Sequence, residues 1–172
     1  KSIGLAHLKE HELPEFLEKL RRYDVDYGGH TLTKLAFQLL ILTFVRSREI
    51  RTAKWDEIDF DKAQWRIPAE RMKMKEVHIV PLSSQSITIL HAIQEISGDN
   101  KHGYLFPSQQ TPHKVMSENT FLRAIQVMDY KGRTTGHGFR STASTILNEN
   151  GVTPDEIERQ IANAERNQNR AA

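Results

Sequence analysis

Apolar residues recur at helical spacing in several segments of the chain. The first segment, from Leu13 to Arg22, is amphipathic and predicts a surface helix. From Leu32 onward apolar side chains occupy almost every side of the next helix, which is typical of a buried, central helix. Further helices are predicted over the segments Ser84–Ile96, Glu118–Met128, His137–Asn150 and Pro154–Ala162, with a last one beginning near Glu165.

Two short segments between these helices alternate apolar and polar residues. They are Gln64–Ile67 and Val77–Val80, and each is followed by a proline. The polar stretch Glu70–Glu76 lies between them and predicts a turn. The sequence therefore predicts a mixed α/β domain, mainly α-helical, with a small antiparallel β-sheet.

The composition excludes several classes of protein. The chain has 172 residues, 38% apolar and 27% charged, which fits one globular domain with its own core. It has no cysteine, which excludes disulfides, thiolate nucleophiles and iron–sulfur clusters. The most apolar stretch, Leu35–Val45, is much shorter than the roughly 20 residues that cross a bilayer. No signal peptide is recognisable, so we expect no membrane and a cytoplasmic location.

The net charge does not by itself indicate a polyanionic partner. Lysine and arginine number 24, aspartate and glutamate 22, so the formal charge is only +2. Local clusters of basic residues therefore decide whether the chain binds nucleic acid.

The segment that begins at His137 places a histidine and an arginine one helical turn apart. His137 and Arg140 lie away from the apolar face formed by Phe139 and its neighbours, in the first turn of a predicted helix. Helix N-termini and arginine side chains both favour phosphate oxygens. The alternative is a solvated helix start with a satisfied histidine.

Two further basic groups lie earlier in the chain. Arg46 is expected at the polar end of the most buried helix, with Glu49 as a candidate partner; the alternative is an arginine that caps this helix. Lys73, in the predicted turn, could reach into a site and transfer a proton; the alternative is a solvated lysine.

Taken together and in this order, these groups resemble the tyrosine recombinases, and most closely the phage-type integrases of prophages and genomic islands. The resemblance covers about residues 30 to 172. The segments that carry it are Arg46–Ile50, Lys54–Asp59, Pro68–Lys73, Ile79–Leu82 and Thr135–Ala143.

The resemblance implies a reaction and a role for each residue. Members of the family cut one DNA strand with a tyrosine, form a 3′-phosphotyrosyl link and need no metal or other cofactor. Arg46 and Arg140 would hold the non-bridging phosphate oxygens. Lys73 would protonate the departing 5′-oxygen, and His137 would manage the proton of the nucleophile. Glu49 would be a supporting acid that orients Arg46.

The sequence departs from the family pattern at two places. Asn163 stands where the family usually has a second histidine, and asparagine can donate a hydrogen bond but cannot titrate. The nucleophilic tyrosine is expected immediately after Ala172, where the chain ends. None of the tyrosines within the chain has the right context, so we expect this polypeptide to bind DNA without cleaving it.

The resemblance also implies a domain organisation and partners. We expect residues 1–13 to be an interdomain linker from an upstream DNA-clamping domain, and residues 14–172 to be the integrase catalytic domain. The expected partners are double-stranded DNA at an attachment site and further integrase protomers. No small-molecule substrate is expected.

Three alternatives remain open at this point. The first is a relative with the same fold that binds DNA but has impaired chemistry, which Asn163 favours. The second is a type IB topoisomerase, which shares the arginine, lysine and histidine chemistry. The third is a zinc peptidase, because His7–His11 fits the short pattern H-x-x-E-H.

Overall fold

The structure is a computed structural model in which residues 8–134 are described. Helices are the main regular structure of these residues, and a three-stranded antiparallel sheet lies between the fourth and the fifth α-helix in the sequence. The α-helices are α1 (Leu13–Arg21), α2 (Tyr23–Asp26), α3 (Thr31–Thr43), α4 (Ser47–Arg51), α5 (Ser84–Ser97) and α6 (Thr120–Val127). The short 3-10 helices are η1 (Glu10–Glu12), η2 (Trp55–Glu57) and η3 (Ala69–Arg71), and the strands are β1 (Ile58–Asp59), β2 (Gln64–Ile67) and β3 (His78–Pro81). The predicted fold class is confirmed.

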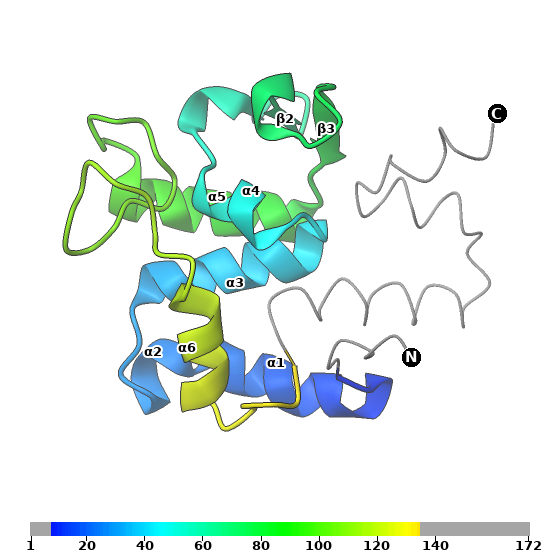
Figure 1. Ribbon diagram of the computed structural model, residues 1–172, viewed down its shortest axis with the longest axis vertical. Helices are drawn as coiled ribbons and strands as arrows, with labels where there is room; N and C mark the ends of the chain where they lie inside the picture. The colour runs from blue at the N-terminus through cyan, green and yellow to red at the C-terminus, as the bar shows by residue number, and fades with distance from the viewer. Residues whose placement is uncertain (1–7, 135–172) are drawn as a thin grey trace, which may run out of the picture.

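Helix α3 forms the centre of the described part of the chain. It lies between α4, α5 and the sheet on one side and α1, α2 and α6 on the other (Figure 1). Phe37 of α3 packs edge-on against Phe121 of α6, with ring centroids 5.2 Å apart, and against Phe16 of α1 at 5.6 Å. Burial on all these sides explains why the sequence of α3 is apolar almost all round.

The sheet has the strand order β1-β2-β3, with both pairs antiparallel. Trp65 of β2 pairs with Ile58 on one side and Val80 on the other, and its side chain is fully buried. The sequence predicted β2 and β3 but not β1. Strand β1 has two residues, too few to show the alternation by which a strand is recognised.

The connection between α2 and α3, which contains Gly28 and Gly29, is a tight packing site. Gly28 has a left-handed φ of 64°, which favours glycine. A Cβ atom on Gly29 would lie 1.9 Å from Cε1 of Tyr23, so only glycine fits under this ring. The turn thus sets the approach of α2 to the start of α3.

Leu8, the first residue that the structure describes, is part of the core and is 1% exposed. Glu12 also forms an ion pair with Arg133, far along the chain. The predicted division into a linker (1–13) and a catalytic domain (14–172) stays a prediction. The helices predicted over 137–150, 154–162 and from 165 lie outside the described residues. Between residues 8 and 134, no helix has the length and apolar character to cross a membrane.

Candidate functional site

Arg46 lies at the start of α4. Helix α3 ends at Thr43, and Phe44 turns the chain with a left-handed φ of 55°. Arg46 then has extended backbone angles and is the N-cap residue of α4. The sequence placed Arg46 at the end of the buried helix. The structure places it two residues beyond Phe44, directly before the next helix. The reversal at Phe44 makes this difference.

Glu49 holds Arg46 in two ways. Its carboxylate accepts a hydrogen bond from the backbone N–H of Arg46, with N···Oε2 2.5 Å, and pairs with the guanidinium, with Nη1···Oε1 3.4 Å. Glu49 is 4% exposed, whereas the Arg46 side chain is 28% exposed. The contact between these two residues, which the sequence suggested, is therefore present. A buried carboxylate fixes the base of an arginine whose side chain is still partly accessible.

Lys73 lies on a turn that joins η3 to β3. The backbone N–H of Lys75 donates to the carbonyl of Met72 at 3.0 Å, which makes Lys73 the second residue of this turn. Lys73 is exposed, but Met72 before it is packed in the core. The turn therefore presents a lysine at the surface directly after a buried anchor.

Arg71 connects this turn to the helix that begins at Arg46. Its guanidinium donates to Oγ1 of Thr52, the C-cap residue of α4, and to the carboxylate of Glu57 in η2. Glu57 also accepts a hydrogen bond from Nε1 of Trp65 at 3.0 Å. Burial raises the pKa of Glu57, while the Trp65 hydrogen bond and the Arg71 charge act in the opposite direction. The elements that carry Arg46 and Lys73 are thus joined by one partly buried polar network.

This network was not predicted from the sequence. Arg71 lies in the predicted turn Glu70–Glu76, and no role was assigned to it, to Thr52 or to Glu57. Arg71 is 19 residues from Thr52 and 14 residues from Glu57. Contacts over such distances in the sequence leave no periodic pattern, so they could not be predicted before the fold was known.

The other candidate residues lie outside the described part of the chain. These are His137, Arg140 and Asn163, so the structure neither joins them to Arg46 and Lys73 nor separates them. His7 of the zinc-peptidase pattern also lies outside, while Glu10 and His11 are exposed. Among the described residues, no group of three histidine, aspartate or glutamate side chains is placed to hold a metal ion.

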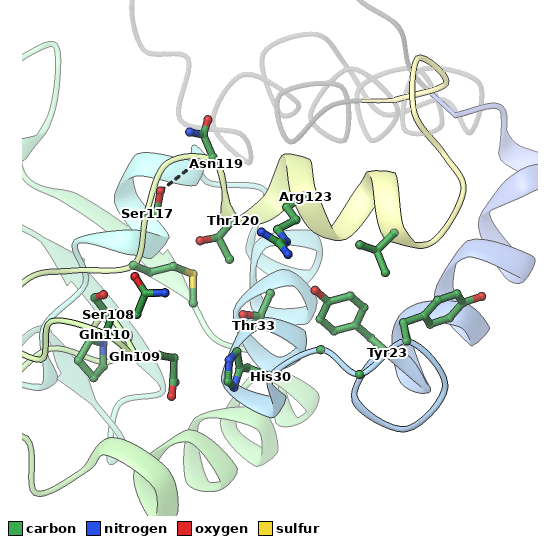
Figure 2. A pocket seen from close by; sticks show the side chains of 16 residues that line it. Tyr23, His30, Thr33, Ser108, Gln109, Gln110, Ser117, Asn119, Thr120 and Arg123 are labelled. Atoms are coloured by element: carbon green, nitrogen blue, oxygen red, sulfur yellow. Dashed lines mark hydrogen bonds between the residues drawn. The ribbon is translucent and has the colours of Figure 1, made fainter.

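A pocket of about 490 Å³ lies at the other end of α3, between the α2–α3 connection, α6 and the loop before α6 (Figure 2). It was not anticipated from the sequence. Its described polar lining comes mainly from amides and hydroxyls, with Arg123 as a cation; the lining includes Tyr23, His30, Thr33, Ser108, Gln109, Gln110, Ser117, Asn119, Thr120 and Arg123. Thr33 of α3 lines the pocket, so about 15 Å of helix separates the pocket from the end of α3 that leads to Arg46. The pocket is therefore distinct from the Arg46 site.

The sequence comparisons give a consistent result. Residues 7–167 match the Phage integrase family. The integrase of Enterobacteria phage P4 is 47% identical over 180 residues, which cover 96% of this chain and 40% of that protein. The prophage integrase IntA of Escherichia coli (strain K12) is 36% identical over 169 residues, covering 98% of this chain and 40% of that protein. The chain therefore spans about two fifths of the length of these relatives.

Solved structures agree at the level of the fold. The XerH site-specific recombinase bound to its difH substrate has a TM-score of 0.73 at 18% identity, over 96% of this chain and 49% of that one. A lambda integrase tetramer bound to a Holliday junction has a TM-score of 0.67 at 15% identity, over 94% of this chain and 47% of that one. The fold is that of a site-specific recombinase catalytic domain. The chain belongs to the phage integrase family, which confirms the resemblance found in the sequence.

Proposed function

We propose that this chain is the catalytic part of a tyrosine-type integrase, which recombines DNA at specific sites through a 3′-phosphotyrosyl intermediate. One observation carries the proposal: in a chain of the phage integrase family, a buried Glu49 holds a partly exposed Arg46 at the start of α4. A held arginine is suited to phosphate because its planar fork can bind two oxygens at once.

In the proposed reaction the nucleophile is a tyrosine supplied from beyond Ala172. Its oxygen bonds to the scissile phosphorus, and the bond from phosphorus to the 5′-oxygen breaks. Arg46 and Arg140 stabilise the charge on the non-bridging oxygens, Lys73 gives a proton to the leaving 5′-oxygen, and His137 handles the proton of the tyrosine. Asn163 donates a hydrogen bond to a phosphate oxygen. The phosphodiester energy is kept in the covalent link, so the reaction requires neither metal nor nucleotide cofactor.

The setting of Arg46 supports its proposed role. An electrostatic contribution is largest when the charged group is already placed before the reaction begins. Glu49 contacts both the backbone and the guanidinium of Arg46, which limits the rearrangement needed when the phosphate becomes pentavalent. Glu49 is accordingly a supporting residue rather than one that touches the DNA.

The proposed partners are double-stranded DNA at an attachment site and further protomers of the same protein. The support is the pair of related structures, XerH with its difH substrate and a lambda integrase tetramer with a Holliday junction. Binding through basic side chains and phosphates should weaken as salt is added.

The test is a trapping experiment with the chain extended through the residues that follow Ala172. A nicked attachment-site duplex lets the short downstream product diffuse away after cleavage, so the covalent complex accumulates. We expect a denaturant-resistant complex in the presence of a chelator, with protein on the 3′-phosphate and a free 5′-hydroxyl. No complex, or protein attached to a 5′-phosphate, would refute the proposal.

A second candidate function is a DNA-binding relative with impaired chemistry. Asn163, at the position where the family usually has histidine, favours it. Asn163→His in the extended protein separates the two functions. An active enzyme should keep equal or higher cleavage, whereas a large gain from an inactive parent would favour the impaired relative.

A further inference from the structure

We propose that Arg71 is a positioning residue, which places Lys73 for proton transfer by tying its turn to the helix of Arg46. The inference rests on the proposed function, in which Lys73 is the general acid. Arg71 lies in the segment Pro68–Lys73 that carries the resemblance, but the proposed mechanism gives it no role.

Arg71 joins three elements at one point. One arm of its guanidinium donates to Thr52 at the end of α4, and the other to Glu57 in η2. Arg71 itself belongs to η3, two residues before Lys73. Arg46 is the N-cap residue of α4, so this bridge connects the helix next to Arg46 with the residues just before Lys73.

Glu57 is a rigid acceptor for this bridge. It is 8% exposed, and Nε1 of the fully buried Trp65 donates to the same carboxylate oxygen that Arg71 contacts. Trp65 is in β2, the middle strand of the sheet. Strand β2 and the connection between β2 and β3 are therefore both bonded to the same carboxylate.

The two residues before Lys73 anchor the turn through different contacts. Met72 packs into the core, and Arg71 is bridged to α4 and η2. Lys73 is then the first exposed residue, and its position depends on these anchors. Lysine at position 71 could not replace arginine fully, because an ammonium lacks the planar fork that reaches two acceptors on separate elements.

The leaving group of the reaction offers a specific test of Lys73 placement. In ordinary DNA the 5′-oxygen leaves as an alcohol only if it receives a proton, here from Nζ of Lys73. When sulfur replaces that bridging oxygen, the P–S bond breaks to a thiolate, which is stable without a proton because thiol pKa values are about 8.5. A defect in proton donation is therefore rescued by the sulfur substrate, while a defect in folding or phosphate binding is not.

The experiment compares cleavage of the oxygen and sulfur substrates by the extended protein. Lys73→Ala should slow cleavage of ordinary DNA by about 10²-fold or more and leave the sulfur substrate little affected. Arg71→Ala should show the same pattern with a smaller loss, about 10-fold or more, because the acid is present but misplaced. Arg66→Ala, at an exposed arginine on β2 of the same hairpin, is the matched control and should leave the ratio of the two rates unchanged.

Each contrary result has a distinct meaning. If Lys73→Ala is not rescued by sulfur, the proposed function of Lys73 fails, and the role of Arg71 fails with it. If Lys73→Ala is rescued but Arg71→Ala loses both substrates equally, or loses neither, only the positioning role is overturned.

A conservative variant keeps the test valid if Arg71→Ala does not fold. Arg71→Lys retains a cation beside Glu57 but loses the fork. We expect a folded protein with an intermediate rate on ordinary DNA and a normal rate on the sulfur substrate. Equal losses on both substrates would overturn the proposal.

Discussion

Arg46 and Lys73 are held by different kinds of contact. Arg46, the N-cap residue of α4, is fixed by Glu49, three residues further along in that helix. Lys73 depends on Met72, which is in the core, and on the bridge that Arg71 makes to two distant residues. These are Thr52 and Glu57, which precede Arg71 by 19 and 14 positions. The contact between Glu49 and Arg46 needs only residues within one helical turn, whereas the setting of Lys73 needs α4, η2 and η3 packed together. Substitutions around Arg46 and substitutions around Lys73 should therefore change cleavage and stability in different ways.

The largest expected effect follows from removing the locally held arginine. Arg46→Ala in the extended protein should reduce covalent complex formation by at least about 10³-fold, because it removes charge at the developing phosphorane. DNA affinity should remain largely intact, as measured by titration with labelled duplex. Arg48→Ala, an exposed arginine of the same helix, is the control. Cleavage by Arg46→Ala near the parent rate would contradict the assigned role.

The contact between Glu49 and Arg46 is tested by substitutions at Glu49. Glu49→Ala leaves the backbone N–H of Arg46 without its acceptor, so we expect a loss of about 1–3 kcal/mol in the free energy of unfolding. Cleavage should fall by about 10-fold or more as Arg46 loses its orientation. Glu49→Gln keeps an oxygen acceptor. Its free energy of unfolding, from denaturant unfolding, and its cleavage, from the trapping assay, should both fall less than those of Glu49→Ala. Equal losses in the two variants would show that the hydrogen bond to the backbone does not matter.

The contact between Arg71 and Glu57 should make the stability of the protein depend on pH. Burial raises the pKa of Glu57, so the folded state retains a proton that the unfolded state has lost, and stability falls as the pH rises through that window. Arg71→Met removes a charge that opposes this shift, so the pKa should rise further. The difference in Tm between the parent protein and Arg71→Met should therefore widen with increasing pH. A constant difference would contradict the pairing.

Glu57→Gln is the control for this measurement. It removes the titrating group, so the pH-dependent part of the Arg71→Met effect should disappear in the double variant. If the effect persists there, another group causes it.

The smallest effect is expected at Thr52. Thr52→Val removes the Arg71 contact and a hydrogen bond from Oγ1 to the carbonyl of Arg48, and should lower the free energy of unfolding by about 1 kcal/mol. The control is Thr88→Val in α5, which loses the same kind of bond, to Ser84, without a bridge. Only Thr52→Val should shift the ratio of sulfur to oxygen cleavage. Identical behaviour of the two variants would place the function of the bridge entirely at Glu57.

The same distinction explains what could be predicted from the sequence. The buried character of α3, strands β2 and β3 and the Arg46–Glu49 contact all depend on neighbours within a few residues, so local spacing indicates them. The two-residue strand β1, the reversal at Phe44 and the Arg71 network depend on packing between distant segments. The pocket beside α6 belongs to the second group, because its walls come from segments nearly a hundred residues apart.

The central claim is that Arg46 and Lys73 act on one phosphate. It is tested most directly by a structure of the extended protein on its attachment-site DNA, with vanadate in place of the scissile phosphate. We predict that the guanidinium of Arg46 contacts the equatorial vanadate oxygens while Nζ of Lys73 contacts the oxygen of the 5′ leaving group. A structure in which these two side chains contact different phosphates would contradict the account.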